Sequence, residues 1–426
     1  MLEQEHEPNV ITIVLTADNH LGYTGSDQHA RKRAELRQRL RRAFRQATEF
    51  AVGQGVDLFI QAGDLFDTTH PDEQDRGYVA ERLSELKQAG IRVFALGGLH
   101  DTPIETHADE VSSAATAAPQ WSYARLGALH YFPSPTASDT GEVLHPVLVD
   151  IRGTLVGLCG FSADAGHAGD SLARVRVDGE IERAAVPLLL LSTPLEEETS
   201  ALSTLLAQTS FRAVLAGCNH AYRRFTTGQT DVIIAGATQR FDFQDPVDEP
   251  GFVFLGIAAD GVRWCRHISV DSIRLRRLEI PLAQWWAETG DTLEPTEPTE
   301  PTEPTEPTTR LLEELRPLCA EDTMVQMCLT GEITRQQYHQ LELSSIRRYG
   351  EMHAFAFSID DSTLRFLPGD QSGVLASHVG VFEERLSPRE ELIALADEWI
   401  SAAQDEQEQK ALLATKEELL AALWIG

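Results

Sequence analysis

Four strand-like apolar runs in this chain end in residue types that ligate metals. In chain order, the runs lead into Asp18 and His20, Asp64 and Asp67, His100 and Asp101, and Cys218 and His220. In open α/β sheets, binding sites form beyond the carboxyl ends of the strands. One such pair would be weak evidence, because capping aspartates and surface histidines are common. The ordered series predicts that these side chains share one metal site.

Carboxylate and imidazole groups suit divalent ions such as manganese. Two such ions, about 3.5–4 Å apart, can clamp the attacking and leaving oxygens of a phosphoester, and a shared carboxylate would bridge them. The series therefore favours metal-assisted phosphoester hydrolysis. The pair Cys218 and His220 leaves three interpretations open at this point: metal ligation, a redox role, or a buried and inert cysteine.

The elements that must position these residues follow from the hydrophobic pattern. Strands are predicted at residues 11–16, 58–62, 91–96, 155–159, 188–191, 213–216, 232–235 and 252–257. A helix between the first two strands carries Leu36, Leu40, Phe44 and Ala47 on one face, and Gly90 ends the next helix. The order strand–helix–strand predicts an α/β fold with a buried central sheet. The later strands favour an antiparallel meander.

Five Glu-Pro-Thr units fill residues 294–308 and mark a boundary. Proline at every third position removes amide donors and favours an extended spacer, which either sets the separation of two domains or is a repeat tolerated in a surface loop. After it, a strand (323–332), a helix (333–350) and a strand (353–360) predict a small second α/β unit, and the C-terminus is predicted to be helical. We therefore expect four regions: 1–285, a linker at 286–309, a small α/β domain at 310–368 and a helical region at 369–426.

Composition narrows the class of protein. The net charge of −30 argues against a chain that coats nucleic acid by itself, although a local basic groove or a basic partner stays compatible with it. The five cysteines are scattered and form no CxxC pair, so neither a disulfide framework nor a structural zinc site is expected. The acidic N-terminus lacks the regions of a signal peptide, and no apolar run is long enough to span a membrane, so we expect a cytoplasmic protein.

The motifs Asp18-x-His20, Gly63-Asp64-x-x-Asp67, Gly98-Leu99-His100-Asp101 and Gly217-Cys218-Asn219-His220 together resemble those of the calcineurin-like metallophosphoesterases. Within that family, three sequence segments are most similar to those of the SbcD-type DNA repair nuclease subunits: "ADNHLG", "GDLFD" and "IIAGATQRFDFQDPVDEPGFVFLGI". The resemblance in motifs covers residues 1–285 well. In the rest of the chain only the order of the predicted elements is similar. It implies a sandwich of two sheets flanked by helices, a small α/β capping domain and C-terminal helices.

The resemblance also implies a ligand set and shows where this chain departs from it. Asp18, His20, Asp64 and His220 stand where the family holds its first ion, and Asp64 would be the bridging carboxylate. At the second ion, Leu99 replaces an Asn, Ser192 or Thr193 stands where a His is expected, and Cys218 replaces another His. These losses cluster on one site, which indicates a selective loss of the second ion.

In the family, the residue matching His100 assists at the scissile phosphate and the residue matching Asp101 orients it, so some catalysis could persist through one ion. The hypothesis from the sequence is one divalent ion, of which manganese is the expected metal, and weak or lost nuclease activity with a scaffolding or DNA-end-binding role. The rival hypotheses are an active exonuclease or phosphodiesterase that uses one ion or recruits Cys218, and a metal-dependent interaction module unrelated to DNA.

Further residues are candidates for contacts with partners. Arg223 and Arg224 follow His220 and could bind DNA phosphates, whereas the arginines of residues 31–45 form either a DNA contact or a solvated helix face. An apolar stripe near the C-terminus either packs on its own domain or docks into a partner's groove: Trp399, Leu419, Leu420, Leu423 and Trp424. The resemblance implies that this partner is an SMC-like coiled-coil ATPase of the SbcC type, and that the chain could form a homodimer.

Overall fold

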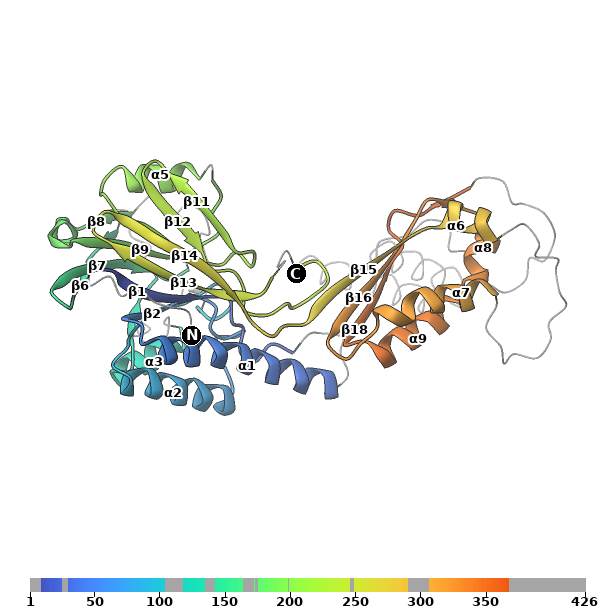
Figure 1. The fold of residues 1–426 in the computed structure, drawn as a ribbon, viewed down its shortest axis with the longest axis horizontal. Coiled ribbons are helices and arrows are strands. Elements are labelled where there is room, and N and C mark those ends of the chain that lie inside the picture. Colours follow the sequence, from blue (N-terminus) through green and yellow to red (C-terminus); the bar gives the residue numbers. More distant parts are fainter. Residues whose placement is uncertain are drawn as a thin grey trace, which may run out of the picture. The chain divides into compact units, whose positions relative to one another are not determined.

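The computed structural model describes residues 9–24, 30–103, 118–134, 142–163, 172, 175–197, 199–245, 249–289 and 306–367. All of these belong to one compact unit, Met1–Leu367. Two six-stranded sheets form a sandwich, and a smaller sheet follows it in the sequence (Figure 1). In the described part of the chain, no helix is both long and apolar enough to cross a membrane.

The first large sheet has the order β14-β13-β1-β2-β3-β4. Its strands are β1 (Ile11–Thr16), β2 (Leu58–Ala62), β3 (Arg92–Leu96), β4 (His130–Phe132), β13 (Gly251–Ala258) and β14 (Gly261–Ser269). Strands β1 to β4 are parallel to one another, whereas β13 is antiparallel to both β1 and β14. The carboxyl ends of β1, β2 and β3 therefore meet at one edge of the sheet, as the sequence predicts.

The second large sheet has the order β11-β12-β10-β9-β7-β6. Its strands are β6 (Val147–Ile151), β7 (Thr154–Phe161), β9 (Val186–Ser192), β10 (Ala213–Gly217), β11 (Arg223–Thr227) and β12 (Thr230–Ile234). The predicted meander is wrong for its centre, because β7, β9, β10 and β12 pair in parallel. The steps from β7 to β9 and from β9 to β10 run through connections that carry η1 (Gly179–Arg183) and α5 (Ser200–Leu206), and the step from β10 to β12 runs through β11. A short pair, β5 (Glu142–Leu144) and β8 (Val175–Val177), forms a separate two-stranded sheet that packs against the second large sheet.

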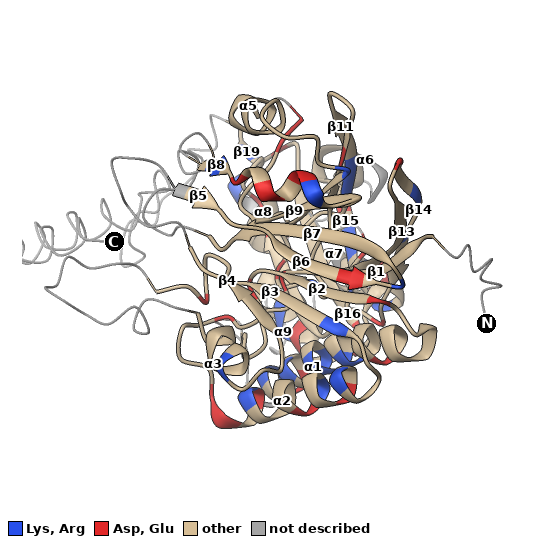
Figure 2. Ribbon diagram, turned by 90° about the vertical axis from the view of Figure 1, so that its left-hand side faces the viewer, with Lys and Arg blue, Asp and Glu red and all other residues tan. Residues whose placement is uncertain are grey.

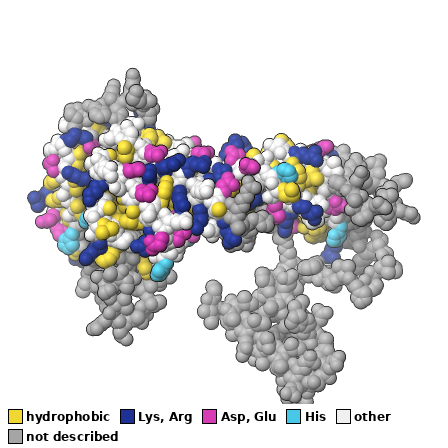
Figure 3. Space-filling view, turned by 90° about the horizontal axis from the view of Figure 1, so that it is seen from below, with side chains coloured by type: hydrophobic (Ala, Val, Ile, Leu, Met, Phe, Trp, Pro, Cys, Tyr) yellow, Lys and Arg dark blue, Asp and Glu magenta, His cyan; other side chains and the backbone are white. Residues whose placement is uncertain are grey.

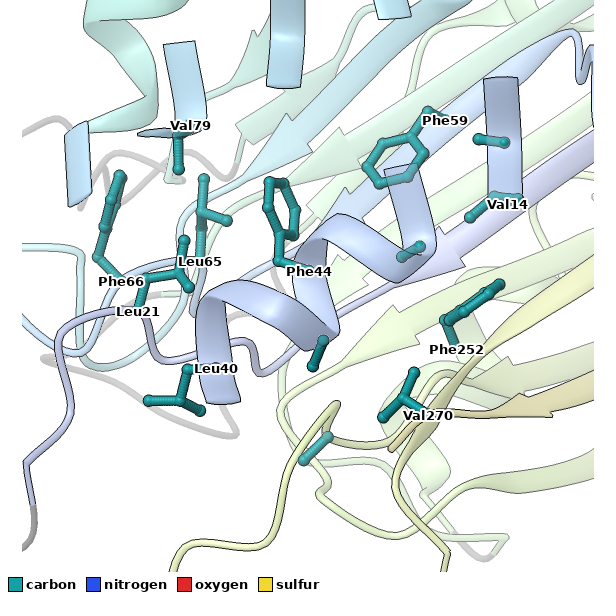
Figure 4. Packing of buried hydrophobic residues seen from close by; sticks show 14 of the residues in the cluster. Val14, Leu21, Leu40, Phe44, Phe59, Leu65, Phe66, Val79, Phe252 and Val270 are labelled. Atoms are coloured by element: carbon teal, nitrogen blue, oxygen red, sulfur yellow. The ribbon is translucent and has the colours of Figure 1, made fainter. Parts of the chain in front are cut away.

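Apolar side chains on both faces of the strands explain the layers. Along β1, Ile13 and Leu15 join the core between the two sheets, while Val14 faces the helices. Helices α1 (Ala30–Gln54) and α2 (Glu73–Gln88) cover the outer face of the first sheet, and α3 (Gln120–Arg125) lies on the same side (Figure 1). The predicted α1 face of Leu36, Leu40, Phe44 and Ala47 is fully buried there, and Figure 4 shows Leu40 and Phe44 among this cluster. Helix α5 covers the outer face of the second sheet.

The small sheet has the order β15-β16-β18, all parallel. Its elements are β15 (Arg274–Pro281), β16 (Thr323–Thr330), β18 (Ala356–Asp360), the pair β17 (Glu332–Ile333) and β19 (Arg365–Phe366), and the helices α6 (Leu282–Thr289), α7 (Glu306–Leu315), η2 (Arg316–Leu318), α8 (Arg335–Gln340) and α9 (Leu343–His353). Strand β15 precedes the repeat yet pairs with β16, although the sequence assigned residues 274–285 to the first domain. The last Glu-Pro-Thr unit forms the first turn of α7, where proline costs no hydrogen bond.

The helix predicted for residues 333–350 is divided in two. Helix α8 ends at Gln340 and α9 begins at Leu343, because Glu342 adopts a left-handed conformation with φ of 40°. The predicted C-terminal helices and their apolar stripe lie outside the described residues. The four-region division of the chain stays a prediction.

Candidate metal centre

The loops that follow β1 and β2 are joined by backbone hydrogen bonds. The amide of Asp18 donates to the carbonyl of Gly63 (3.0 Å), and the amides of Asn19 and His20 both donate to the carbonyl of Asp64 (2.9 and 3.0 Å). Two glycines allow the chain after β3 and the end of β10 to approach the end of β2 closely. A Cβ at Gly98 would lie 2.2 Å from the Asp64 side chain, and one at Gly217 would lie 2.2 Å from the Ala62 carbonyl oxygen.

Strained backbone concentrates at these loops. Among the described non-glycine residues, positive φ values occur at Asp18 (47°), His20 (44°), Asp64 (52°) and Cys218 (79°), and elsewhere only at Arg152 and Glu342. Such conformations are unfavourable and persist where the surrounding structure over-determines them, often at functional sites. Four of the six therefore coincide with residues singled out from the sequence.

Asp18, His20 and His220 form a cluster whose ligand atoms all lie within 4.8 Å of one another. Asp18 is fully buried, His20 is 3% exposed, and His220 is half-buried. They come from the carboxyl ends of β1 and β10, so both large sheets contribute. One carboxylate and two imidazoles are a donor set that could hold a divalent ion.

Both imidazoles of this cluster are held by carboxylates. His20 Nδ1 lies 2.9 Å from Asp67 Oδ1, and His220 Nδ1 lies 3.2 Å from Asp245 Oδ1. Such a contact at Nδ1 fixes the proton there and leaves the lone pair at Nε2 for a metal. The Nε2 atom of His20 is buried and has no hydrogen-bond partner among the described residues. An unsatisfied buried nitrogen of this kind is what a metal ligand presents when the ion is not part of the structure.

The surroundings of the three cluster residues raise their pKa values. Burial, and next the negative charge of Asp64, raises the pKa of Asp18 to about 7. Burial by itself lowers the pKa of His220, but the hydrogen bond to Asp245 and the charge of Asp18 outweigh it and raise that pKa. The pKa of His20 is raised against its burial in the same way, first by Asp67. A divalent cation would satisfy this excess of buried negative charge.

Asp64, the fourth predicted ligand, is buried but is not in the cluster of three. Its Oδ1 accepts a hydrogen bond of 2.7 Å from the backbone amide of His100. One carboxylate oxygen is therefore occupied by the chain itself.

The predicted second-ion positions contain no comparable cluster within the described residues. Ser192 is fully buried, and its Oγ lies 2.1 Å from where a Cβ on Gly63 would be, so the hydroxyl packs against that loop. The Cys218 amide donates to both oxygens of Asp18 (3.2 and 3.1 Å). Burial, followed by the charges of Asp18 and Asp64, raises the pKa of the Cys218 thiol and keeps it neutral in the metal-free fold. Leu99 is half-buried and has no donor atom.

His100 and Asp101 are adjacent in sequence but have different surroundings. The side chain of His100 is 55% exposed, and its Nδ1 lies 3.9 Å from Asp67 Oδ1. The buried Asp101 instead accepts hydrogen bonds from the amides of Gly98 (2.7 Å) and Phe66 (3.1 Å) and from Gln120 Nε2 (2.6 Å). Burial, and next Asp64, raises the pKa of Asp101 to about 7. The carboxylate that faces His100 is thus Asp67, while Asp101 holds the loops after β2 and β3 together.

A second group that could hold a metal comprises His20, Asp67 and His100. Its shortest contact, 2.9 Å between His20 and Asp67, has the length of a hydrogen bond. We interpret this group as a hydrogen bond between Asp67 and His20, with the His100 imidazole 3.9 Å from the same carboxylate oxygen.

Several basic residues of α1 form ion pairs or hydrogen bonds with other residues of the chain. Arg37 and Arg41 each contact the buried Asp75 of α2 at 2.6 Å, and Lys32 donates to the carbonyls of Glu351 and Ala354 at the end of α9 (2.7 and 2.9 Å). In Figure 2 the ribbon of α1 is blue at its Lys and Arg positions, and Figure 3, seen from below, shows basic and acidic side chains intermixed. These contacts weaken the interpretation of α1 as a DNA-binding face.

Arg223 and Arg224 lie exposed at the start of β11. Arg224 pairs with Asp231 at 2.9 Å, whereas Arg223 has no ion pair in the described part of the chain. Of the two candidates for phosphate contact, Arg223 is the more available. The predicted partner-binding residues Trp399, Leu419, Leu420, Leu423 and Trp424 lie outside the described residues.

Comparison with known proteins places this site in a family. The model of the family described as calcineurin-like phosphoesterase matches residues 11–236, which contain all four strand ends. The chain belongs to this family. Two sheets flanked by helices, with the ligand cluster where strands end, are the metallophosphoesterase fold that the sequence implied, and members of the family use divalent metals.

Among curated relatives of this metallophosphoesterase, the DNA double-strand break repair protein Mre11 of Methanosarcina mazei is 38% identical over 96 residues, which cover 22% of this chain and 15% of that protein. Mre11 of Halobacterium salinarum is 26% identical over 250 residues, which cover 58% of this chain and 57% of that protein. The chain thus spans less than two thirds of these relatives. Among solved structures, a dimetal phosphatase from Danio rerio matches with a TM-score of 0.36 and 12% identity, over 61% of this chain and 99% of that one.

The sequence left Asp245 out of the site and placed Asp67 in it without a specific role. Asp67 was visible at the second strand end, but nothing in its spacing showed that it would face two imidazoles. Asp245 lies 25 residues after His220, inside a turn, so no local motif joins the two.

Proposed function

We propose that this chain is an SbcD-like, Mre11-related subunit of a DNA repair complex that binds a single divalent ion. The observation that carries this proposal is the cluster of Asp18, His20 and His220, with each imidazole held at Nδ1 by its own carboxylate. Membership in the calcineurin-like phosphoesterase family supports it, as do relatives named as DNA double-strand break repair proteins.

Asp18, His20 and His220 would hold the ion together with the free oxygen of Asp64, and manganese suits this mixture of carboxylate and imidazole. Such an ion, when bound, polarises a phosphoryl oxygen and lowers the pKa of water. The chain's own residues orient the ligands: Asp67 and Asp245 fix the imidazoles, and the His100 amide holds Asp64.

Nuclease activity is weak or lost in this proposal, and the subunit acts as a scaffold or binds DNA ends. A two-ion mechanism needs donors where the chain has Leu99, the packed hydroxyl of Ser192 and the neutral thiol of Cys218. Without a second ion, the charge that develops on the phosphate is poorly neutralised.

The alternative is an active exonuclease or phosphodiesterase that works with one ion or with a modified Cys218 site. The position of His100 favours this alternative: it is 55% exposed, next to the ligand cluster, and near Asp67. An imidazole in that position could donate a proton to a leaving group.

The partners are part of the proposal. DNA would bind within a complex that also contains an SMC-like coiled-coil ATPase of the SbcC type, with Arg223 among the phosphate contacts. Homodimerisation and a cytoplasmic location are further expectations that follow from the resemblance and the sequence.

A nuclease assay with manganese separates the two functions. We expect the full chain to show little or no hydrolysis of linear DNA or of a chromogenic phosphodiester, and a gel shift with DNA that strengthens when the ATPase is added. His100→Ala should then change neither result. Robust manganese-dependent hydrolysis that His100→Ala abolishes would favour the active enzyme instead.

A further inference from the structure

A short turn beside the ligand cluster holds both of its imidazoles. Residues 239–245, called the metal-side turn below, follow an isolated bridge that joins Ala17 to Ala237. Within the turn, the side chain of Asp245 is 2% exposed. Its Oδ1 contacts His220 Nδ1 at 3.2 Å, and its Oδ2 accepts the amide of Phe241 at 3.1 Å. Both oxygens are therefore committed, and the carboxylate has a fixed direction toward His220.

Phe241 adds an apolar wall to the same imidazoles. Its ring centroid lies 4.8 Å from that of His20 and 5.2 Å from that of His220, with tilted or edge-on geometry. Such contacts restrict the rotation of both rings without supplying a hydrogen bond. One residue of the turn thus contacts two ligands that come from different sheets.

The turn keeps its shape through contacts that do not involve the ligands. The Oδ1 of Asp242 accepts the amides of Gln244 (2.8 Å) and Asp245 (2.7 Å), which closes the turn. Gln239 Oε1 accepts the amide of Ile273 at 2.8 Å, and Arg277 Nη2 donates to the Phe243 carbonyl at 3.2 Å. These bonds attach the turn to β15 and to the segment just before it, so its geometry is set before any ion arrives.

We propose that Asp245 is a positioning residue for the metal ligand His220, and that the metal-side turn preorganises both imidazoles through Asp245 and Phe241. The proposal rests on the metal binding put forward above. It adds that the affinity for the ion depends on residues that never touch the ion. Carboxylates behind a ligating histidine commonly contribute 10–100-fold to metal affinity.

Calorimetric titration of the full-length metal-free chain with Mn²⁺ tests the proposal, together with the rise in melting temperature that Mn²⁺ causes. Asp245→Asn should raise the Kd for Mn²⁺ about 10–100-fold, since the amide is a weaker acceptor for His220. Phe241→Leu keeps the apolar volume but removes the ring, and should raise the Kd about two- to tenfold, since the lost contact is weaker. Asp260→Asn, at an exposed carboxylate that pairs with Arg263, is the matched control and should leave the Kd unchanged.

The two readouts separate positioning from a purely structural role. A structural role would lower the melting temperature of the metal-free variants and leave the Kd of the folded protein as in wild type. Unchanged Kd values for both Asp245→Asn and Phe241→Leu would overturn this inference while leaving the proposed metal binding intact. A wild-type chain that binds no Mn²⁺ would overturn the proposed function and this inference together.

Discussion

On the first-ion side of the site, formed by Asp18, His20 and His220, each imidazole has a carboxylate behind it and a buried or half-buried setting. On the second-ion side, at Leu99, Ser192 and Cys218, the chain supplies an alkyl group, a packed hydroxyl and a thiol whose pKa burial has raised. The first side has the supporting contacts that metal-ligating histidines commonly have. The second side offers poorer ligand types at the predicted positions, and the Ser192 hydroxyl packs against the loop at Gly63.

The difference shows that the carboxylates that hold a metal-ligating histidine indicate a metal site as much as the histidine itself does. A drifting site would lose the carboxylates behind its histidines as readily as the histidines, because both serve the same ion. Asp67 and Asp245 both contact their histidines, which is the arrangement that the proposed metal binding requires. The predictions below test that asymmetry, from the largest expected effect to the smallest.

Removing a first-side ligand should abolish metal binding. Asp18→Asn takes away the only carboxylate of the cluster, so Mn²⁺ at 100 times the wild-type Kd should no longer stabilise the fold, whereas wild type gains about 2.7 kcal/mol. Because burial raises the pKa of Asp18 to about 7, ionising it costs stability in the metal-free fold at higher pH, and the metal-free variant should be at least as stable as wild type.

Thermal unfolding with and without Mn²⁺ at pH 8 checks both statements. Asp231→Asn, which alters a carboxylate paired with Arg224 at the surface, is the control. A full metal-induced stabilisation in Asp18→Asn would show that the first side is not where the ion binds.

The affinity for Mn²⁺ should fall steeply on acidification. An ion needs Asp18 ionised and His20 and His220 neutral, and the pKa of each is raised in the metal-free site. Below pH 7 the proton therefore competes with the metal, and each displaced proton weakens binding by up to about tenfold per pH unit. Calorimetry at pH 8, 7 and 6, in buffers of different ionisation enthalpy, measures the Kd and the protons released. A Kd that stays flat between pH 8 and 6 would contradict this use of the cluster.

Replacing a carboxylate that holds a ligand histidine should lower the affinity for the ion without abolishing binding. Asp67→Asn leaves all ligands in place but loosens His20, so the Kd for Mn²⁺ should rise about 10–100-fold. Asp178→Asn, where the carboxylate contacts the exposed His145, is the control for the same chemical change away from the site. If Asp67→Asn binds Mn²⁺ as tightly as wild type, the carboxylates behind the histidines do not contribute to metal affinity as we infer.

Restoring one second-side ligand should have the smallest effect. Cys218→His supplies an imidazole, but Leu99 offers no donor and the Ser192 hydroxyl is packed against Gly63. We expect the variant to bind one Mn²⁺ per chain and to remain as inactive as wild type. A second bound ion with new nuclease activity from this one substitution would refute the account of the second side.

Much of the fold followed from the sequence, because its central strands are continuous apolar runs. Strands β1 and β2 have the predicted limits, and the predicted apolar face of α1 is buried. The edge strands β14 and β15 were not predicted, since they are half-exposed and rich in arginine and show no apolar run. The parallel pairing of β9, β10 and β12 was missed because short crossovers resemble the loops of a meander.

The candidate site was predictable where ligands follow strands and unpredictable where contacts cross the fold. Asp18, His20 and His220 were named from sequence because each stands at the carboxyl end of a strand. The role of Asp245 depends on a turn that folds back onto His220, and the separation of Asp101 from His100 depends on Gln120 and two backbone amides. Tertiary hydrogen bonds of this kind leave no periodic signal in a single sequence.

The central claim is one ion on the first side and none on the second. Anomalous scattering from a crystal of the full chain soaked in Mn²⁺ counts the ions and places them directly. The account predicts a single manganese peak between Asp18, His20 and His220, in contact with Asp64. Two peaks, or a peak between Asp64 and Cys218, would contradict it.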